Sequence, residues 1–130
     1  MASARDQLQE ALKSKGQPAA ALTTPVASFS DWQFYGQDNE IFVSVTITPG
    51  SSLYSISYAL VLLQTPDEVL LCEGSLSTSN AGNGWTLNLA TSNYAYDVQQ
   101  YGTSVQALAF AQVYGVGQVW SPVQNYTVST

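Results

Sequence analysis

The chain has 130 residues, of which 45% are hydrophobic, and its formal net charge is −6 with no histidine. This length predicts one domain that is large enough to be stable without crosslinks. All three basic residues lie in the first fifteen positions, so the acidic remainder excludes nucleic-acid binding, phosphate clamping and histidine or lysine chemistry.

Residues 1–16 have the pattern of a short amphipathic helix. Its apolar side chains fall on one helical face: Ala4, Leu8, Ala11 and Leu12. Gly16 is a suitable helix stop, and residues 17–28, with two prolines, are predicted to form a linker. A helix of this length is marginal in water, so Leu8 and Leu12 are expected to pack on the body of the chain or on a partner.

From about Phe29 the hydrophobic period changes from 3.6 residues to two, which indicates β-strands. The pattern predicts about seven strands from there to the C-terminus, with no helix between them. The later ones are expected at 40–48, 54–62, 69–76, 85–89, 103–114 and 118–128. Residues 77–84 and 92–102 are predicted to be irregular loops, and Pro122 indicates a sheet edge or a bulge. The fold class is therefore all-β, an antiparallel sandwich over residues 29–130.

The C-terminal segment 105–130 resembles the closing F–G hairpin of fibronectin type III domains. It combines a strand of alternating alanines, a turn at 115–117 and the step Trp-Ser-Pro at 120–122. The tryptophan usual in the second strand of that family is absent, since residues 41–48 contain none. The resemblance implies an immunoglobulin-like sandwich and implies nothing about function.

Catalytic chemistry has few residues to use. A serine or cysteine nucleophile normally needs a histidine or lysine base, and residues 16–130 contain neither. Paired carboxylates of the kind used in glycoside hydrolysis remain an alternative, with Asp31, Asp38 and Glu40 closest in sequence. Carboxylates in turns more often hydrogen-bond their own backbone, so the sequence predicts no enzyme.

No cofactor or metal site is expected either. With one cysteine and no histidine, the chain lacks the ligands that zinc prefers. Calcium needs only oxygen ligands, but neither 38–40 nor 67–68 has the spacing of a calcium loop. Cys72 cannot form a disulfide within the chain, and its neighbours predict a small core residue.

Tyrosines are dense in the loop predicted at 92–102. Tyrosine beside amides and a carboxylate suits a neutral polar ligand, because the ring offers an apolar face while the polar groups orient hydroxyls. The candidate ligand-binding residues are Asn93, Tyr94, Tyr96, Asp97 and Tyr101. Packing of these tyrosines against the end of the sandwich is the alternative.

Two functions follow as hypotheses. The first is a protein–protein interaction or self-assembly module, because the body has no lysine to protect its sheet edges and the helix suits docking. Its candidate interface residues are Leu8, Leu12, Trp32 and Tyr35, with Tyr126 as a further exposed aromatic. The second is a small lectin-like protein that binds a neutral glycan with the tyrosine-rich loop.

Location is predicted only by default. The N-terminus lacks the apolar region of a signal peptide, so cytoplasmic residence is the expectation, unless a leader was removed. The longest apolar run, residues 59–63, is far too short to span a bilayer, so no membrane span is expected.

Overall fold

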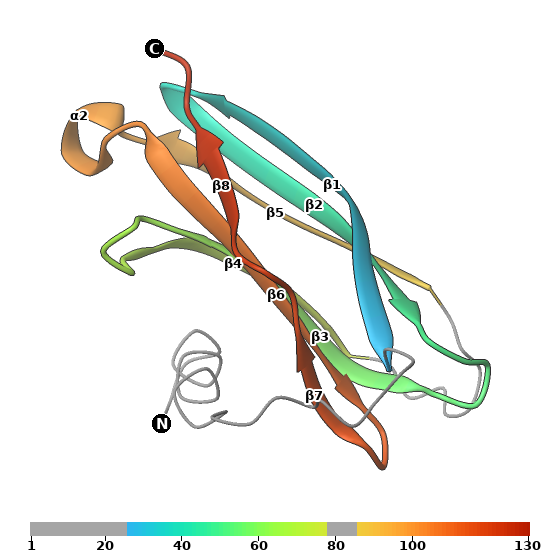
Figure 1. Cartoon of the computed structure of the whole chain (residues 1–130). Helices are drawn as coiled ribbons and strands as arrows, with labels where there is room; N and C mark the ends of the chain where they lie inside the picture. The colour runs from blue at the N-terminus through green and yellow to red at the C-terminus, as the bar shows by residue number, and fades with distance from the viewer. Residues whose placement is uncertain (1–25, 78–85) are drawn as a thin grey trace.

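A computed structural model describes residues 26–77 and 86–130, which form a sandwich of two β-sheets (Figure 1). The helix predicted for residues 1–16, with Leu8 and Leu12, lies outside the described residues, as do most of the linker and the loop 78–85. The first strand begins at Ala27, inside the range expected to be linker. The all-β sandwich expected from the period of two is confirmed.

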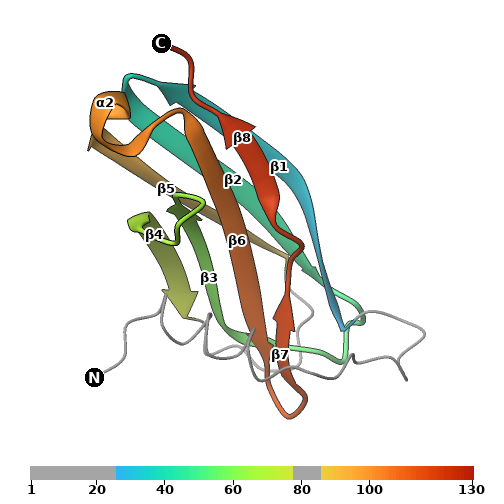
Figure 2. The same cartoon turned by 60° about the vertical axis from the view of Figure 1, so that its left-hand side comes forward.

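The strands are β1 (Ala27–Gln37), β2 (Asn39–Pro49), β3 (Ile56–Gln64), β4 (Leu70–Ser77), β5 (Leu87–Tyr96), β6 (Ser104–Val113), β7 (Gly117–Trp120) and β8 (Gln124–Thr127). The three-stranded sheet has the order β1-β2-β5, and the larger sheet has the order β4-β3-β6-β7 with β8 also paired to β6. All ladders between these strands are antiparallel, and the two layers face each other in Figure 2. This arrangement is compatible with an immunoglobulin-like sandwich.

The core lies between the sheets and follows the alternation of the sequence. In β2 every second residue from Ile41 to Ile47 is at most 1% exposed, while the residues between them face outward. The other sheet contributes Ala59, Val61 and Leu63 from β3, and the alanines of β6. Burial of one face of β2 therefore sets its register, because a shift by one residue would expose the whole set from Ile41 to Ile47.

The segment 92–102 is more regular than predicted. Strand β5 continues to Tyr96, and a short helix, α2 (Val98–Tyr101), joins it to β6. Asn93 pairs with Ile41 of β2, so the ladder extends a run whose own composition indicated a loop. Pairing with a neighbouring strand overrides weak local propensity in this segment. Among the described residues, no helix is long and apolar enough to cross a membrane.

The predicted last strand is split in two at Pro122. Ser121 is buried, and its hydroxyl accepts a hydrogen bond from the Ala109 backbone N–H at 2.9 Å and donates one to the Pro122 carbonyl. The Ser121 hydroxyl thus provides an acceptor for the β6 backbone next to Pro122, which has no backbone N–H to continue the ladder. Pro122 thus lies at a break in an edge strand, as its position in the sequence indicated.

Contacts between the sheets close both sides of the sandwich. On one side the rings of Phe34 in β1 and Tyr126 in β8 stack with their centroids 4.4 Å apart, so Tyr126 is not the free aromatic expected from sequence. On the other side the Asn93 amide donates a hydrogen bond to the Leu71 carbonyl of β4 at 2.9 Å. The outer faces of the sheets therefore remain as the broad surfaces.

Candidate functional site

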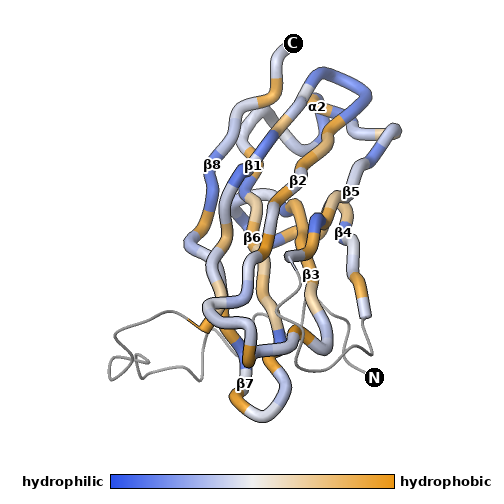
Figure 3. Tube along the Cα trace, turned by 90° about the vertical axis from the view of Figure 1, so that its right-hand side faces the viewer, coloured by the Kyte–Doolittle hydropathy of each residue, from blue (hydrophilic) through white to orange (hydrophobic). Residues whose placement is uncertain are grey.

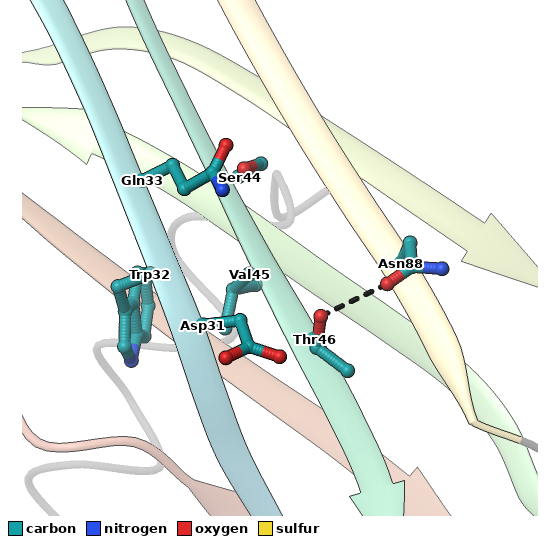
Figure 4. Close-up of a pocket in the computed structure, with 7 residues that line it drawn as sticks. All are labelled: Asp31, Trp32, Gln33, Ser44, Val45, Thr46 and Asn88. Atoms are coloured by element: carbon teal, nitrogen blue, oxygen red, sulfur yellow. Dashed lines mark hydrogen bonds between the residues drawn. The ribbon is translucent and has the colours of Figure 1, made fainter.

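An open groove of about 560 Å³ lies on the outer face of the three-stranded sheet (Figure 4). Three adjacent strands supply its lining, so the groove rests on rigid secondary structure and not on a loop. We call it the outer groove; its residues are Asp31, Trp32, Gln33, Ser44, Val45, Thr46 and Asn88.

A bulge in β1 shapes one wall of the outer groove. The register with β2 shifts between Ser30 and Gln33, and Asp31 has a positive φ of 53°. Aspartate tolerates this left-handed conformation better than most residues, but it still stores strain, which is common at functional sites. Figure 4 shows the Asp31 carboxylate turned toward Thr46, while the Trp32 ring lies on the other side of β1. The bulge therefore places a carboxylate inside the groove and leaves Trp32 half-buried against the core.

The floor of the outer groove carries amides and hydroxyls. Thr46 and Asn88 lie opposite each other in the β2–β5 ladder, and the threonine hydroxyl donates a hydrogen bond to the Asn88 side-chain oxygen at 2.9 Å. That bond leaves the Asn88 NH₂ group free to donate to a ligand. Gln33 lies opposite Ser44 in the β1–β2 ladder, which brings a second amide and a second hydroxyl together.

An aromatic pair continues the same face beyond Gln33 and Ser44. Tyr35 lies opposite Phe42, and the tyrosine side chain is 46% exposed. Phe42 is the apolar residue that interrupts the polar face of its strand, and it is half-buried beneath this surface. Residues two apart on a strand share a face, so the pair extends the polar groove with an apolar platform.

The tyrosine-rich segment proposed as a ligand site has mainly structural contacts. Tyr96 is 1% exposed and donates its hydroxyl to the Gly102 carbonyl, which ties β5 to the turn after α2. Tyr101 stacks on Tyr96 with ring centroids 5.8 Å apart. Burial, reinforced by the charges of Asp38 and Asp97, raises the pKa of the Tyr96 hydroxyl above its usual value. These two rings therefore pack against the end of the sandwich, the alternative that the sequence left open.

The polar residues of that segment are also engaged. The Asp97 side chain accepts a hydrogen bond from the Gln99 backbone N–H at 3.0 Å and so caps α2. Asn93 bridges to β4 and also accepts from the Ala95 N–H at 2.8 Å. Of the three tyrosines among the five predicted ligand residues, only Tyr94 is exposed, at 74%. The five residues are neighbours in the chain, but the structure leaves only the tyrosine ring of Tyr94 exposed to a ligand.

Cys72 lies against the core, half-buried on β4, as the sequence predicted. Burial raises the pKa of its thiol, and a hydrogen bond with Thr91 acts in the opposite direction. The raised pKa keeps the thiol protonated and weakly nucleophilic near neutral pH. Within residues 26–77 and 86–130, no group of three His, Cys, Asp or Glu side chains is placed to hold a metal ion.

Sequence reasoning found Asp31 and Trp32 for other reasons and missed Gln33, Asn88 and the groove as a unit. The available signal was the polar alternation of β2, in which Ser44 and Thr46 share a face with Phe42. The strand order β1-β2-β5 could not be predicted from the sequence, because β5 is far from β2 in the chain. The pairing of Thr46 with Asn88 depends on that order.

No family model and no curated protein matches the sequence. Solved crystal structures match the fold. A DUF3823 family protein from Parabacteroides merdae aligns with TM-score 0.54 at 16% identity, over 79% of this chain and 53% of that one. A DUF3823 family protein from Bacteroides ovatus aligns with TM-score 0.55 at 12% identity, over 82% and 57%. "A putative carbohydrate binding protein" from Bacteroides uniformis aligns with TM-score 0.52 at 14% identity, over 81% and 58%.

These identities establish likeness of fold and nothing finer. The chain spans between half and three fifths of the length of each of these three proteins. The protein is thus a β-sandwich similar in fold to part of several Bacteroides and Parabacteroides proteins, two of them from the DUF3823 family.

Proposed function

We propose that this chain is a non-catalytic binding module whose ligand is a neutral glycan, held in the outer groove and on the adjoining aromatic pair. The observation that carries the proposal is the composition of one continuous face. It offers a carboxylate, two amides and two hydroxyls from three adjacent strands, next to the exposed ring of Tyr35.

Sugars present hydroxyls at the rim of each ring and C–H groups on its faces. The Asp31 carboxylate accepts hydrogen bonds from hydroxyls, and the free amide group of Asn88 donates to them. An exposed aromatic ring covers the apolar face of a sugar, as Tyr35 is placed to do. An open groove on a sheet face suits an extended chain, which can enter from either end.

The charge of the chain favours a neutral ligand over an anionic one. Residues 26–130 contain no lysine, arginine or histidine, so no side chain of the described body can neutralise a phosphate, sulfate or carboxylate. Asp31 would repel such a group directly. The fold likeness to the Bacteroides uniformis protein agrees with a glycan ligand but does not identify one.

A glycan array with the parent protein tests the proposal, followed by two single variants. Tyr35→Ala removes the platform, and Gln33→Ala removes an amide from the groove. We expect each variant to weaken binding by about tenfold, the equivalent of about 1.4 kcal/mol.

Matched controls exist on another part of the molecule. Tyr114 is 70% exposed in the β6–β7 turn and Gln118 is exposed on β7, so Tyr114→Ala and Gln118→Ala remove the same groups elsewhere. Binding should be unchanged in both. Absence of glycan binding by the parent, or equal loss in the controls, would contradict the proposal.

Self-assembly is the second candidate function, and β4 is the feature that favours it. β4 pairs with β3 alone among the described strands, so its other edge has no ladder partner there. Val69 and Leu76, at the two ends of this hairpin arm, are 46% and 39% exposed. β4 carries the exposed carboxylate of Glu73 but no lysine, and an edge without lysine is suited to pairing with another copy.

Light scattering over a range of concentrations tests this second candidate. A stable dimer that becomes monomeric in Leu76→Lys would support it, because a charged edge residue opposes strand pairing. A monomer at all concentrations would exclude assembly through this edge and would leave the glycan proposal untouched.

A further inference from the structure

The five-stranded sheet has a second apolar cluster on the face that points away from the core. Four of its side chains are at most 3% exposed: Leu60, Leu62, Leu108 and Phe110. Tyr58, Leu70 and Trp120 pack around them. Figure 3 shows apolar residues running along β3 and β6, in contrast with the more polar β8. We call this the outer cluster.

The burial of the outer cluster is unexpected for an outward-facing surface. Antiparallel sheets usually present polar side chains on a face that meets water, and a strand apolar on both faces indicates cover on both. Leu60 and Leu62 are 0% exposed, and the described side chains packed against the cluster, Tyr58, Leu70 and Trp120, are themselves only partly buried. The described strands all belong to the two sheets and α2 lies at the β5–β6 connection, so among these elements none forms a third layer (Figures 1 and 2).

A buried polar atom on the same face also lacks a partner in the described part of the chain. Gln64 follows Leu62 on the outward side of β3 and is only 4% exposed. Its amide nitrogen reaches Gln106 at 3.5 Å, but within residues 26–77 and 86–130 its side-chain oxygen accepts no hydrogen bond. A buried acceptor without a donor is costly, so this position suits a donor side chain from whatever covers the sheet.

We propose that the amphipathic N-terminal segment, residues 3–15 of the same chain, docks on the outer cluster. Its predicted apolar stripe, centred on Leu8 and Leu12, matches the apolar surface, and its Gln, Lys and Arg side chains supply donors. The other segment outside the described residues, 78–85, is rich in Asn and Gly, has Trp85 as its one large apolar residue and must connect β4 to β5. It offers no comparable apolar stripe.

Charge agrees with this occupant. All basic residues of the chain lie in the segment, at Arg5, Lys13 and Lys15. Three of the seven carboxylates of residues 16–130 lie on the β3–β4 hairpin that borders the outer cluster: Asp67, Glu68 and Glu73. Glu73 pairs in register with Leu62 of the cluster itself. The segment can therefore form ion pairs with its own body that no other part of the chain can form.

The length of the connection also allows docking within one chain. Val26 lies at the end of the sandwich where β2 passes to β3, since its carbonyl accepts the Gly50 N–H at 2.7 Å. From Val26 the connection must cross the thickness of one sheet and reach a helix axis above its outer face, a distance of roughly 20 Å in all. Residues 17–25 span up to about 30 Å when extended, which is enough.

The experiment uses the full chain with labelled leucine methyl groups. We expect nuclear Overhauser contacts between Leu8 or Leu12 and the methyls of Leu60, Leu62 or Leu108 in a monomeric sample. The double variant Leu8→Asp with Leu12→Asp should abolish these contacts, shift the Leu60 and Leu62 resonances, and raise the fluorescence of an apolar dye. The matched variant Gln9→Asp with Ser14→Asp adds the same charge at polar positions and should leave all three readouts unchanged.

Two outcomes would overturn the proposal. A monomeric parent chain without these contacts, whose Leu60 and Leu62 resonances do not respond to the double variant, would show that the segment lies elsewhere. Contacts found only between differently labelled copies in a mixed sample would assign the outer cluster to a second copy instead. If the double variant fails to fold, the contacts in the parent chain still decide between these results.

Discussion

Tyr35 lies directly opposite Phe42 across the β1–β2 ladder, on the face of the sheet that points away from the core. The tyrosine is 46% exposed and the phenylalanine is half-buried beside it. Cross-strand aromatic neighbours stabilise a sheet by about 0.2–1 kcal/mol relative to alanines. We therefore expect Tyr35→Ala to lower the unfolding free energy by less than about 1 kcal/mol in urea titrations. A larger loss would mean that any binding defect of this variant reflects unfolding; Tyr35→Phe keeps the ring and serves as the control.

We predict that Asp31 lowers the stability of the fold through its backbone conformation, while its carboxylate contributes to glycan binding. Its φ of 53° lies in the left-handed region, where glycine meets no steric cost. Asp31→Gly should keep the unfolding free energy or raise it by up to about 1 kcal/mol, while glycan binding falls because the carboxylate is lost. Asp31→Asn separates charge from backbone conformation, since asparagine also tolerates this φ. Clear destabilisation of the glycine variant would show that the bulge is held by contacts of the side chain.

Burial of the Tyr96 hydroxyl, with the nearby charges of Asp38 and Asp97, should make stability fall at alkaline pH. The pKa of Tyr96 is raised by burial in the folded state, so the folded chain holds its proton more tightly than the unfolded chain does. This contribution is complete below about pH 10, the unfolded value, and is lost as the pH rises through the folded pKa. Urea titrations between pH 8 and 11 should show the decline.

Tyr96→Phe should reduce that alkaline slope and cost about 1–2 kcal/mol at neutral pH, because the Gly102 carbonyl loses its donor. The slope should not vanish, since burial also raises the pKa of Tyr126 and of Cys72. An unchanged slope in the variant would contradict the assignment to Tyr96.

Gly74 marks a close approach between the sheets. A Cβ atom added there would lie 2.4 Å from the Ala90 carbonyl oxygen of β5, and a backbone atom cannot move aside cheaply. Gly74→Ala is expected to destabilise the protein by about 1–3 kcal/mol in thermal or urea unfolding. The neighbouring exposed Ser75 gives the control, because Ser75→Ala should stay within about 0.5 kcal/mol of the parent.

Ser121 is predicted to hold the break between β7 and β8. Ser121→Ala would leave the buried Ala109 N–H without its acceptor at 2.9 Å, at a cost of about 1–3 kcal/mol. Amide hydrogen exchange at Ala109 should quicken as well. Ser121→Thr retains the hydroxyl, and a loss of stability equal to that of the alanine variant would indicate a role in packing instead.

The sequence by itself determined the all-β class, the positions of most strands and the acidic body, because burial of one sheet face imposes a period of two on the residues. The glycine turn at 115–117 and the interruption at Pro122 followed from local chemistry that needs no partner. The apolar run from Ala59 to Leu63 lies in β3, where every one of these residues is buried.

Only the tertiary structure decided which polar residues share a surface. Thr46 and Asn88 are far apart in the chain, and the order of strands in the sheet brings them within a hydrogen bond. In the same way, pairing with β2 turned the segment around Asn93 from an expected loop into strand, and packing buried the Tyr96 ring. Composition is a local property, whereas exposure and neighbourhood depend on long-range pairing, and that difference moved the candidate glycan site from a tyrosine-rich segment to the outer groove.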